Sequence, residues 1–335
     1  MKEYLFYPGC SMESTAKSYF QSVMQVCNPL EIHLMEIDDW NCCGATEYLS
    51  LDRIPAYSLI ARNLALAQNQ ANGSRSIVAP CSACYLNLTK ADHYMREDQV
   101  FGEKINKALS AGNLHYSSGE MDIHHLLDVV LNDIGIEEIK SKVVKPLTNL
   151  RVAPFVGCMV PRPDYGHHFS DSEHPTELDD LLKALGAEVI DFPLKTACCG
   201  GHMTQIGPDT AFELIRRLIS SANEYKADAL VTICPMCQMN LDAFQGQMNG
   251  YFKTNYKIPI LFFTQLMGIA FGLEPEKLGF GSEFVSARPA MKKIGVKTPE
   301  PATISPERRK SAGLPMPPPL KKDDPSTRGS KEDNP

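Results

Sequence analysis

The sequence predicts an α/β protein of two tandem domains related by a pseudo-twofold axis, each a small parallel sheet flanked by helices. Three observations support this fold: short apolar runs typical of buried strands, amphipathic segments between them, and a cysteine pattern that occurs twice. With 335 residues, of which 43% are hydrophobic and 22% charged, the chain is long enough to bury two ordinary cores.

Short β-rich apolar runs bounded by Gly, Pro or Cys predict the strands. They occupy matching places in the two halves of the chain: residues 4–8, 32–40 and 76–80, and then 152–156, 188–194 and 229–233. Each run leads into a cysteine group. Because ligands gather beyond the carboxyl ends of parallel strands, the cysteines of each half should meet at one edge of its sheet.

Helical patterns separate these strands. Residues 54–69 and 211–222 carry apolar side chains at helical spacing, and residues 177–185 end at Gly186, a common helix stop. Strands that alternate with helices predict a parallel sheet covered by helices on both faces.

Ten of the eleven cysteines form one pattern used twice: a single Cys, a Cys-Cys-Gly and a Cys-x-x-Cys. The gaps between the groups are 31 and 37 residues in the first set and 39 and 34 in the second. Corresponding groups lie 148, 156 and 153 residues apart, so the chain is a duplication with small loop insertions. The two sets are Cys10, Cys42, Cys43, Cys81 and Cys84, and Cys158, Cys198, Cys199, Cys234 and Cys237.

Five converging thiolates exceed the four ligands of a tetrahedral zinc site and are the ligand type of iron–sulfur clusters. The alternative interpretation, buried apolar thiols, suits a single cysteine better than ten in two matching sets. The eleventh, Cys27, follows Val23 and Val26 in a helical stretch and is interpreted as a core thiol.

Composition divides the chain into three parts. The first domain should span residues 1–148 and the second residues 149–288. The last 47 residues contain ten of the 24 prolines together with mixed charges, which predicts a disordered tail over residues 289–335.

Charge and hydropathy exclude several classes of function. The net charge of −7 argues against a nucleic-acid surface, and no apolar stretch reaches the length of a membrane span. The first residues lack the apolar core of a secretory signal, so we expect a cytoplasmic protein, in which structural disulfides are rare.

The motifs around the cysteines resemble those of the CCG-domain proteins, and in detail those of the B subunit of heterodisulfide reductase. The resemblance covers about residues 3–280. It is carried by Tyr7-Pro8-Gly9-Cys10-Ser11, Asp39-Trp40-Asn41-Cys42-Cys43-Gly44-Ala45 and Pro80-Cys81-Ser82-Ala83-Cys84, and by Gly157-Cys158, Arg162-Pro163, Pro193-Leu194-Lys195-Thr196, Cys198-Cys199-Gly200-Gly201 and Cys234-Pro235-Met236-Cys237-Gln238.

The resemblance implies that each five-cysteine set holds one noncubane [4Fe-4S] cluster. It also implies a catalytic subunit that reduces a disulfide, or oxidises thiols in reverse, between the two clusters. The chain has no ferredoxin-type cysteine run and no dinucleotide or flavin motif. Electrons should therefore come from partners, which in that family are a small subunit with cubane clusters and a flavin-containing subunit.

Cations near the second cysteine set are candidates for contacts with an anionic thiol substrate: Arg162, His167, His168, Lys195 and His202. His202 follows the Cys-Cys-Gly-Gly turn and is the preferred proton donor or anion contact, with a hydrogen-bonded core or surface histidine as the alternative. The pair His124-His125 lies on an amphipathic segment and is interpreted as structural.

Three functional alternatives remain open. Within the disulfide-reductase interpretation, the methanogen type and the bacterial sulfur-oxidation type are not distinguished. A second possibility is an electron-relay subunit of another oxidoreductase, such as a thiol-dependent fumarate reductase, a succinate dehydrogenase or a lactate-oxidising complex. A third is a zinc-binding scaffold without catalytic activity.

Overall fold

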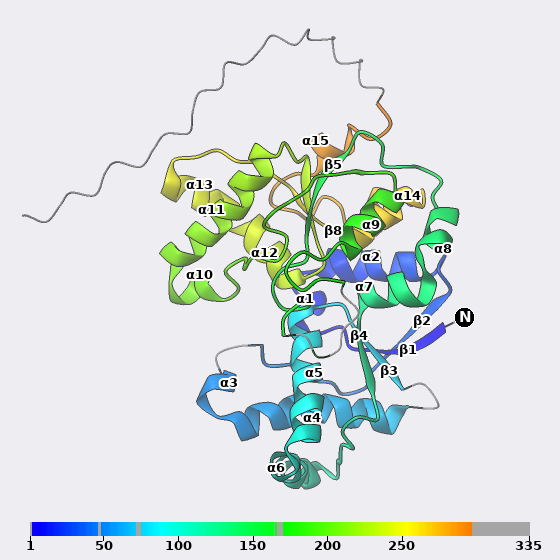
Figure 1. The fold of residues 1–335 in the computed structure, drawn as a ribbon, viewed down its shortest axis with the longest axis vertical. Coiled ribbons are helices and arrows are strands. Elements are labelled where there is room, and N and C mark those ends of the chain that lie inside the picture. The colour runs from blue at the N-terminus through cyan, green and yellow to red at the C-terminus, as the bar shows by residue number, and fades with distance from the viewer. Residues whose placement is uncertain (1, 46–47, 72–74, 164, 166–169, 297–335) are drawn as a thin grey trace, which may run out of the picture. The chain divides into compact units, whose positions relative to one another are not determined.

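The computed structural model of the chain describes residues 2–45, 48–71, 75–163, 165 and 170–296. It confirms the α/β class, with two four-stranded sheets in which every strand pair is parallel (Figure 1). The strand order is β2-β1-β3-β4 in the first sheet and β6-β5-β7-β8 in the second. The two orders correspond strand by strand, as a duplicated domain requires.

Each predicted strand is present, although several are shorter than the apolar runs that predicted them. The strands are β1 Lys2–Phe6, β2 Ile32–Glu36, β3 Ser76–Ala79, β4 Asp122–His125, β5 Arg151–Phe155, β6 Glu188–Val189, β7 Ala229–Thr232 and β8 Ile260–Phe262. The sequence did not predict β4 and β8. Three of the four residues of β4 are polar, and β8 has only three residues, so neither shows the pattern of a buried strand.

Helices connect the strands of each sheet. In the first half they are α1 Cys10–Glu13, α2 Lys17–Cys27, α3 Tyr48–Leu51, α4 Arg53–Gln70, α5 Ser82–Glu97, α6 Gln99–Leu109, η1 Ser110–Gly112, α7 Leu126–Asp128, η2 Val129–Ile134 and α8 Ile136–Ser141. In the second half they are α9 Glu177–Ala184, α10 Met203–Ile206, α11 Pro208–Glu224, α12 Pro235–Ala243, α13 Gln245–Phe252, α14 Phe263–Ala270, η3 Pro275–Leu278 and α15 Arg288–Met291.

The three predicted helices are present as α4, α9 and α11, and local sequence features explain the start of α11 and the end of α9. In α11, Pro208 stands in the first turn, where its missing N–H is not needed, and Ile215, Leu218 and Ile219 are buried. α9 is followed by Gly186 with a φ of 88°, a conformation that favours glycine.

The two halves pack against each other through α2 and α14 (Figure 1). The Tyr19 ring of α2 stacks on Phe262, with 4.1 Å between the ring centroids and 3° between their planes. Beside this stack, the buried hydroxyls of Ser22 and Thr264 lie 2.6 Å apart and hydrogen-bond to each other. The described residues therefore form one compact unit that contains both sheets.

The predicted tail begins too early in the chain. Pro289 lies in the first turn of α15, a favourable position for proline, and Ala290 is buried. The Gly295 N–H donates to the carbonyl of Thr148, so residues 289–296 belong to the compact unit. The rest of the predicted tail, residues 297–335, lies outside the described residues. Among the described helices, none is both long enough and apolar enough to cross a bilayer.

Candidate metal centre

The structure gathers each five-cysteine set at the carboxyl edge of its sheet. The first pentad, Cys10, Cys42, Cys43, Cys81 and Cys84, lies in the connections after β1, β2 and β3. The second pentad, Cys158, Cys198, Cys199, Cys234 and Cys237, lies in the equivalent connections after β5, β6 and β7. Cys27 belongs to neither pentad, and its burial raises the pKa of its thiol to about 12, as expected for a core thiol.

Sulfur contacts join the members of each pentad. In the first, the sulfur–sulfur distances are 3.4 Å for Cys10 and Cys42 and 3.3 Å for Cys43 and Cys84. The Cys42 thiol also hydrogen-bonds to that of Cys43, and the Cys81 thiol to that of Cys84. The second pentad repeats three of these four contacts: the Cys158 thiol hydrogen-bonds to that of Cys198, and the Cys237 thiol to those of Cys199 and Cys234.

The pentads have an open side and a buried side. Cys10, Cys42 and Cys198 are exposed, whereas both cysteines of each Cys-x-x-Cys are buried. An external molecule can therefore reach each pentad from one side, while the opposite side is enclosed by protein.

The two pentads meet on their buried sides. The thiols of Cys81 and Cys234 are hydrogen-bonding neighbours. The Tyr19 hydroxyl lies 3.3 Å from the carbonyl oxygen of Pro80 and 3.2 Å from that of Ile233, the residues that precede these two cysteines. A single phenol therefore ties together the two turns that carry the innermost ligand candidates.

Two equivalent glycines leave room beside the sulfurs. Gly9 and Gly157 directly precede Cys10 and Cys158 and have φ values of 72° and 75°. A Cβ atom would lie 2.8 Å from Cys84 Sγ at Gly9 and 3.2 Å from Cys237 Sγ at Gly157. A side chain at either position would strain the backbone and crowd a sulfur.

Two equivalent asparagines fix the Cys-Cys turns. Asn87 Nδ2 donates to the carbonyl of Cys43, and Asn240 Nδ2 donates to the carbonyls of Cys199 and Gly201. Both are buried and stand three residues after the last cysteine of their Cys-x-x-Cys. We did not single them out from the sequence, although their repetition at the 153-residue offset was visible there.

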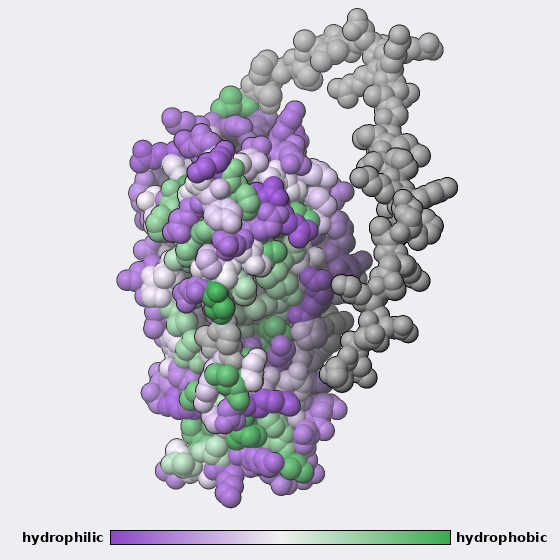
Figure 2. Space-filling model, turned by 90° about the vertical axis from the view of Figure 1, so that its left-hand side faces the viewer, coloured by the Kyte–Doolittle hydropathy of each residue, from purple (hydrophilic) through white to green (hydrophobic). Residues whose placement is uncertain are grey.

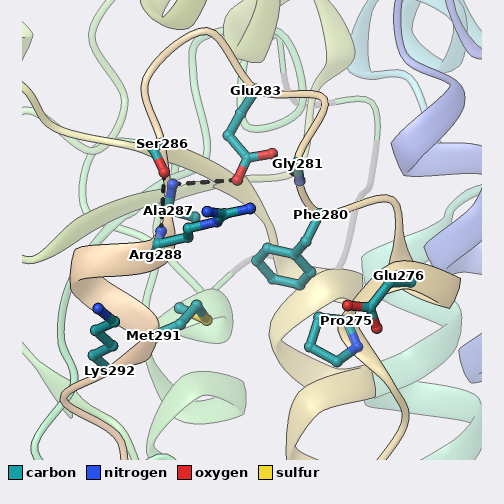
Figure 3. Close-up of a pocket in the computed structure, with 10 residues that line it drawn as sticks. All are labelled: Pro275, Glu276, Phe280, Gly281, Glu283, Ser286, Ala287, Arg288, Met291 and Lys292. Carbon is teal, nitrogen blue, oxygen red and sulfur yellow. Dashed lines mark hydrogen bonds between the residues drawn. The ribbon is translucent and has the colours of Figure 1, made fainter.

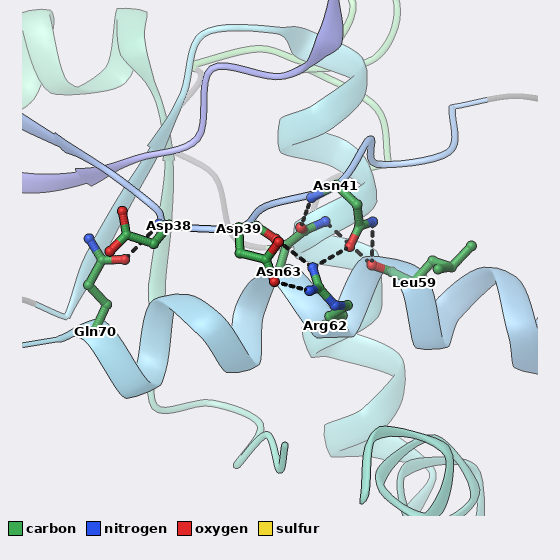
Figure 4. Close-up of polar contacts among 7 residues, drawn as sticks. All are labelled: Asp38, Asp39, Asn41, Leu59, Arg62, Asn63 and Gln70. Atoms are coloured by element: carbon green, nitrogen blue, oxygen red, sulfur yellow. Dashed lines mark hydrogen bonds and ion pairs between the residues drawn. The ribbon is translucent and has the colours of Figure 1, made fainter. Parts of the chain in front are cut away.

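In the first half, the loop before Cys42 is anchored to α4 (Figure 4). The Asn41 N–H donates to Asn63 Oδ1 at 2.8 Å, and Arg62 Nη1 donates to the carbonyl of Asp39 at 2.6 Å. Tyr7 Oη also donates to the carbonyl of Asn41 at 2.6 Å. These bonds position Cys42 without touching its sulfur.

Mutual hydrogen bonding separates the thiols into more and less acidic members. Hydrogen bonds from Cys10 and Cys43 lower the pKa of Cys42 to about 2, and the bond from Cys158 lowers that of Cys198 to about 6. The pKa values of Cys10 and Cys158 rise in return. Each pentad therefore has a sulfur that favours the thiolate form, which is the form that binds metals.

The residues of both pentads fit an iron–sulfur cluster in donor type and number. No three of the described His, Cys, Asp and Glu side chains surround a single point as ligands of one ion, because the sulfurs contact one another directly. A cluster would therefore have to separate the sulfurs. The exposed positions of Cys10, Cys42 and Cys198 give them space to move apart.

The predicted substrate contacts differ in their placement. His202 lies near the first pentad, where its charge would help to lower the pKa of Cys42. Lys195 is fully buried, with Nζ 2.8 Å from Asp179 Oδ2, so it does not offer a cation to a substrate. Arg162 pairs with Glu173 and donates to the carbonyl of Thr196, which supports the loop before Cys198. His167 and His168 lie outside the described residues.

Apolar side chains gather on the face that carries α3 and α10 (Figure 2). These two short helices directly follow the two Cys-Cys turns, and their last residues, Leu51 and Ile206, are 80% and 60% exposed. The rim of the candidate site is therefore apolar in both halves.

A separate pocket of 480 Å³ lies between η3 and α15 (Figure 3). It is lined by side chains of both charges, including Glu283 and Arg288, and by no cysteine. Glu283 accepts a hydrogen bond from the Ala287 N–H, so this carboxylate supports the start of α15.

Comparison with known proteins identifies the family. Residues 4–89 and 152–242 each match the CCG family, described as a cysteine-rich domain. The chain is 36% identical over 286 residues to the 8-methylmenaquinol:fumarate reductase membrane anchor subunit of Wolinella succinogenes, covering 85% of this chain and 98% of that one. It is 27% identical over 282 residues to the B subunit of the ferredoxin:CoB-CoM heterodisulfide reductase of Methanosarcina mazei, covering 83% and 92%.

A protein of Archaeoglobus profundus described as similar to the heterodisulfide reductase B subunit is 28% identical over 283 residues, covering 83% of this chain and 93% of that one. Among solved structures, a hypothetical protein from Helicobacter pylori shares the fold with a TM-score of 0.67 and 15% identity. The match covers 85% of this chain and 52% of the other. With both halves matched and all ten cysteines of the two pentads present, the chain belongs to the CCG family of cysteine-rich domain proteins, whose members include heterodisulfide reductase B subunits.

Proposed function

We propose that the chain is a redox subunit of a multi-subunit oxidoreductase and that each pentad binds one [4Fe-4S] cluster of the noncubane kind. The observation that carries this proposal is the contact between the pentads at Cys81 and Cys234, beneath the carbonyls that Tyr19 ties together. Two ligand sets this close suit a two-electron substrate. When bound, two one-electron clusters would together supply the electrons that convert a disulfide into two thiols.

The chain's own residues would enclose and orient such a disulfide. The exposed Cys10, Cys42 and Cys198 mark the open side, where a substrate can enter. His202 lies near Cys42 and is the preferred group to hold an anionic substrate or to donate a proton to a nascent thiolate. The heterodisulfide reductase relatives support this activity and the need for partner subunits, for which a cubane-cluster subunit and a flavin subunit are our candidates.

A second candidate function is electron relay in a complex that acts on fumarate or succinate. Its support is the 36% identity to a fumarate reductase membrane anchor subunit, higher than the identity to the heterodisulfide reductase subunits. The apolar rim around Leu51 and Ile206 suits contact with a partner subunit in either role.

Metal analysis of protein purified without oxygen tests the cofactor. We expect about eight iron atoms per chain and no zinc, because the two pentads would each hold four irons. Replacing Cys84 or Cys237 by Ser should remove about half of the iron, whereas the matched control Cys27→Ala should retain all of it. Trp40, the only tryptophan, should lose fluorescence as the first pentad is loaded. Zinc as the bound metal would refute the proposal.

Turnover assays separate the two candidate functions. The disulfide-reductase function predicts oxidation of a reduced viologen when a heterodisulfide is added to the iron-loaded chain. The relay function predicts no such turnover with any disulfide, but restored electron transfer when the chain is added to the catalytic subunits of a fumarate reductase. The variant His202→Ala should slow the oxidation of viologen by the disulfide but not the electron transfer to the fumarate reductase subunits.

A further inference from the structure

A pocket of 420 Å³ lies between α4 and the end of α6 and is lined by no cysteine. Four α4 residues form one wall and share a face of the helix, because they follow one another at helical spacing: Pro55, Ser58, Leu59 and Arg62. The opposite wall is apolar and includes Leu109 of α6. Leu59 is 48% exposed, so an apolar side chain of another molecule can pack against it from solvent.

The two helices around this pocket are basic, although the chain as a whole is acidic. Together they have four cations and one anion, against a net charge of −7 for the whole sequence. These charged residues are Arg53, Arg62, Lys104, Lys107 and Glu103. Lys104 and Lys107 are exposed, and Lys104 stands one helical turn before the lining residue Ala108. A complementary partner therefore presents carboxylates around an apolar side chain.

Two residues of the pocket wall also hold the loop before Cys42 (Figure 4). The carbonyl of Leu59 accepts a hydrogen bond from Asn41 Nδ2 at 3.0 Å, and Arg62 Nη1 donates to Asn41 Oδ1 at 3.1 Å. Arg62 also pairs with the Asp39 carboxylate and donates to the Asp39 carbonyl. Asn41 directly precedes Cys42, so a single side chain connects the pocket wall to the first pentad.

The second half provides an internal comparison, because its fold repeats the first. There the residue before the Cys-Cys pair is Ala197, whose methyl group cannot form hydrogen bonds. In α11, the helix that corresponds to α4, Arg216 pairs with Glu213 of the same helix and stacks over Phe252 at 5.1 Å from the ring centroid. α11 also has more acidic than basic residues. The basic pocket and its connection to a cysteine loop are therefore not a requirement of the repeated fold.

We propose that the pocket between α4 and α6 is the docking site of a redox partner with an acidic surface, which inserts an apolar side chain beside Leu59 and places carboxylates near Lys104 and Lys107. This inference rests on the proposed function and names the surface and the chemistry of the partner. A pocket receives a protruding side chain, as protein interfaces do, whereas binding to a bilayer requires apolar groups that protrude from the protein. Because Leu59 and Arg62 hold Asn41, a partner in the pocket restrains the loop before Cys42 and slows the loss of iron from the first pentad.

Titration calorimetry of the iron-loaded full chain tests the docking site. The probe is a ferredoxin with two [4Fe-4S] clusters, a small acidic electron carrier. Leu59→Asp places a carboxylate in the pocket and should raise the Kd about tenfold or more. Lys104→Glu should raise the Kd about threefold or more at low salt, and high salt should remove the difference. The matched control is Val144→Asp, which adds the same charge at a 72% exposed apolar position beside α14 and should leave the Kd unchanged.

A second measurement tests the connection to the Cys42 loop. The chain is loaded with ⁵⁷Fe, so that its iron is distinguished from that of the ferredoxin, and release to a chelator is followed. The ferredoxin should slow release from Cys237→Ser, which retains the first pentad, and not from Cys84→Ser, which retains the second. Equal effects on the two variants would contradict the connection.

Several outcomes would overturn the docking site itself: a wild-type chain that does not bind the ferredoxin, an unchanged Kd in both Leu59→Asp and Lys104→Glu, or an equal loss of affinity in Val144→Asp. Binding to phosphatidylglycerol vesicles that depends on Leu59, without binding to the ferredoxin, would assign the surface to a membrane and also overturn the inference. A chain that binds no iron would instead refute the proposed function, so the two failures are distinguishable.

Discussion

At the scale of single residues, the buried ion pair of Lys195 and Asp179 supports the second pentad. The Lys195 side chain is fully buried, and its own carbonyl accepts hydrogen bonds from the N–H groups of Val156 and Gly157, just before Cys158. Three residues further along the chain stands Cys198. Lys195 therefore links α9 to two connections that carry ligand candidates.

Removing the ammonium group should destabilise the fold strongly. We expect Lys195→Met to lower the free energy of unfolding by about 3–5 kcal/mol, because it leaves the Asp179 carboxylate buried without its partner. Urea denaturation of the metal-free chain measures this. The control is Lys183→Met, which removes an exposed pair with Asp180 and should cost less than about 1 kcal/mol. An equal decrease in the free energy of unfolding in Lys195→Met and Lys183→Met would contradict the prediction.

The two asparagines offer a second comparison between residues. Asn240 donates to one buried and one half-buried carbonyl, and Asn87 donates to one buried carbonyl. We expect Asn240→Ala to cost about 1–3 kcal/mol and Asn87→Ala less, because each lost donor leaves a carbonyl unpaired. Release of iron to a chelator should accelerate in the same order. Asn132→Ala removes an exposed amide and should change neither quantity.

At the scale of elements, β4 illustrates how one strand gives neighbouring residues opposite environments. Successive side chains of a strand point to opposite faces. His124 hydrogen-bonds to Asp128 at 2.7 Å, which raises its pKa. His125 is buried at the junction of the halves, and burial lowers its pKa to about 4.

These two histidines should give opposite dependences of stability on pH. The contribution of His125 is present above an unfolded pKa near 6.5 and is lost as the pH falls toward 4, amounting to about 3 kcal/mol. The contribution of His124 is present below pH 6.5 and is lost as the pH rises through its raised pKa. Unfolding of metal-free His124→Gln and His125→Gln, compared with the wild type between pH 4 and 8, measures both. Parallel curves would show that neither histidine changes its proton affinity on folding.

At the scale of the whole molecule, the junction of the halves is both the structural core and the proposed site. Tyr19, Phe262, Ser22 and Thr264 are buried there, and the stack of Tyr19 on Phe262 and the hydrogen bond between Ser22 and Thr264 each join one half of the chain to the other. Separating the halves would expose these groups. The halves should therefore fold as one cooperative unit.

Two spectroscopic probes test this cooperativity. Trp40 reports on the first half alone, whereas far-ultraviolet circular dichroism reports on both. We expect one denaturant transition that coincides for both probes. Phe262→Ala removes the ring stacked on Tyr19 and should lower the unfolding free energy by about 3–5 kcal/mol. Two separate transitions in the wild type would show that the halves are independent domains.

Much of the fold and the grouping of the ten cysteines was readable from residue order. Repeated spacing identifies the duplication and both pentads, because the same connections of a repeated fold carry the cysteines in each half. Local patterns likewise predicted six strands and the helices α4, α9 and α11. They missed β4 and β8, since a short strand is defined by its neighbours in the sheet rather than by its own composition.

Packing in three dimensions determined the rest. Lys195 looked like a substrate contact beside Cys198, but the fold buries it against Asp179, because the α9 carboxylate is distant in sequence and near in space. The role of Tyr19 was invisible for the same reason. Its hydroxyl reaches the carbonyl of Ile233 in the other half, and only the association of the two sheets brings these two groups together.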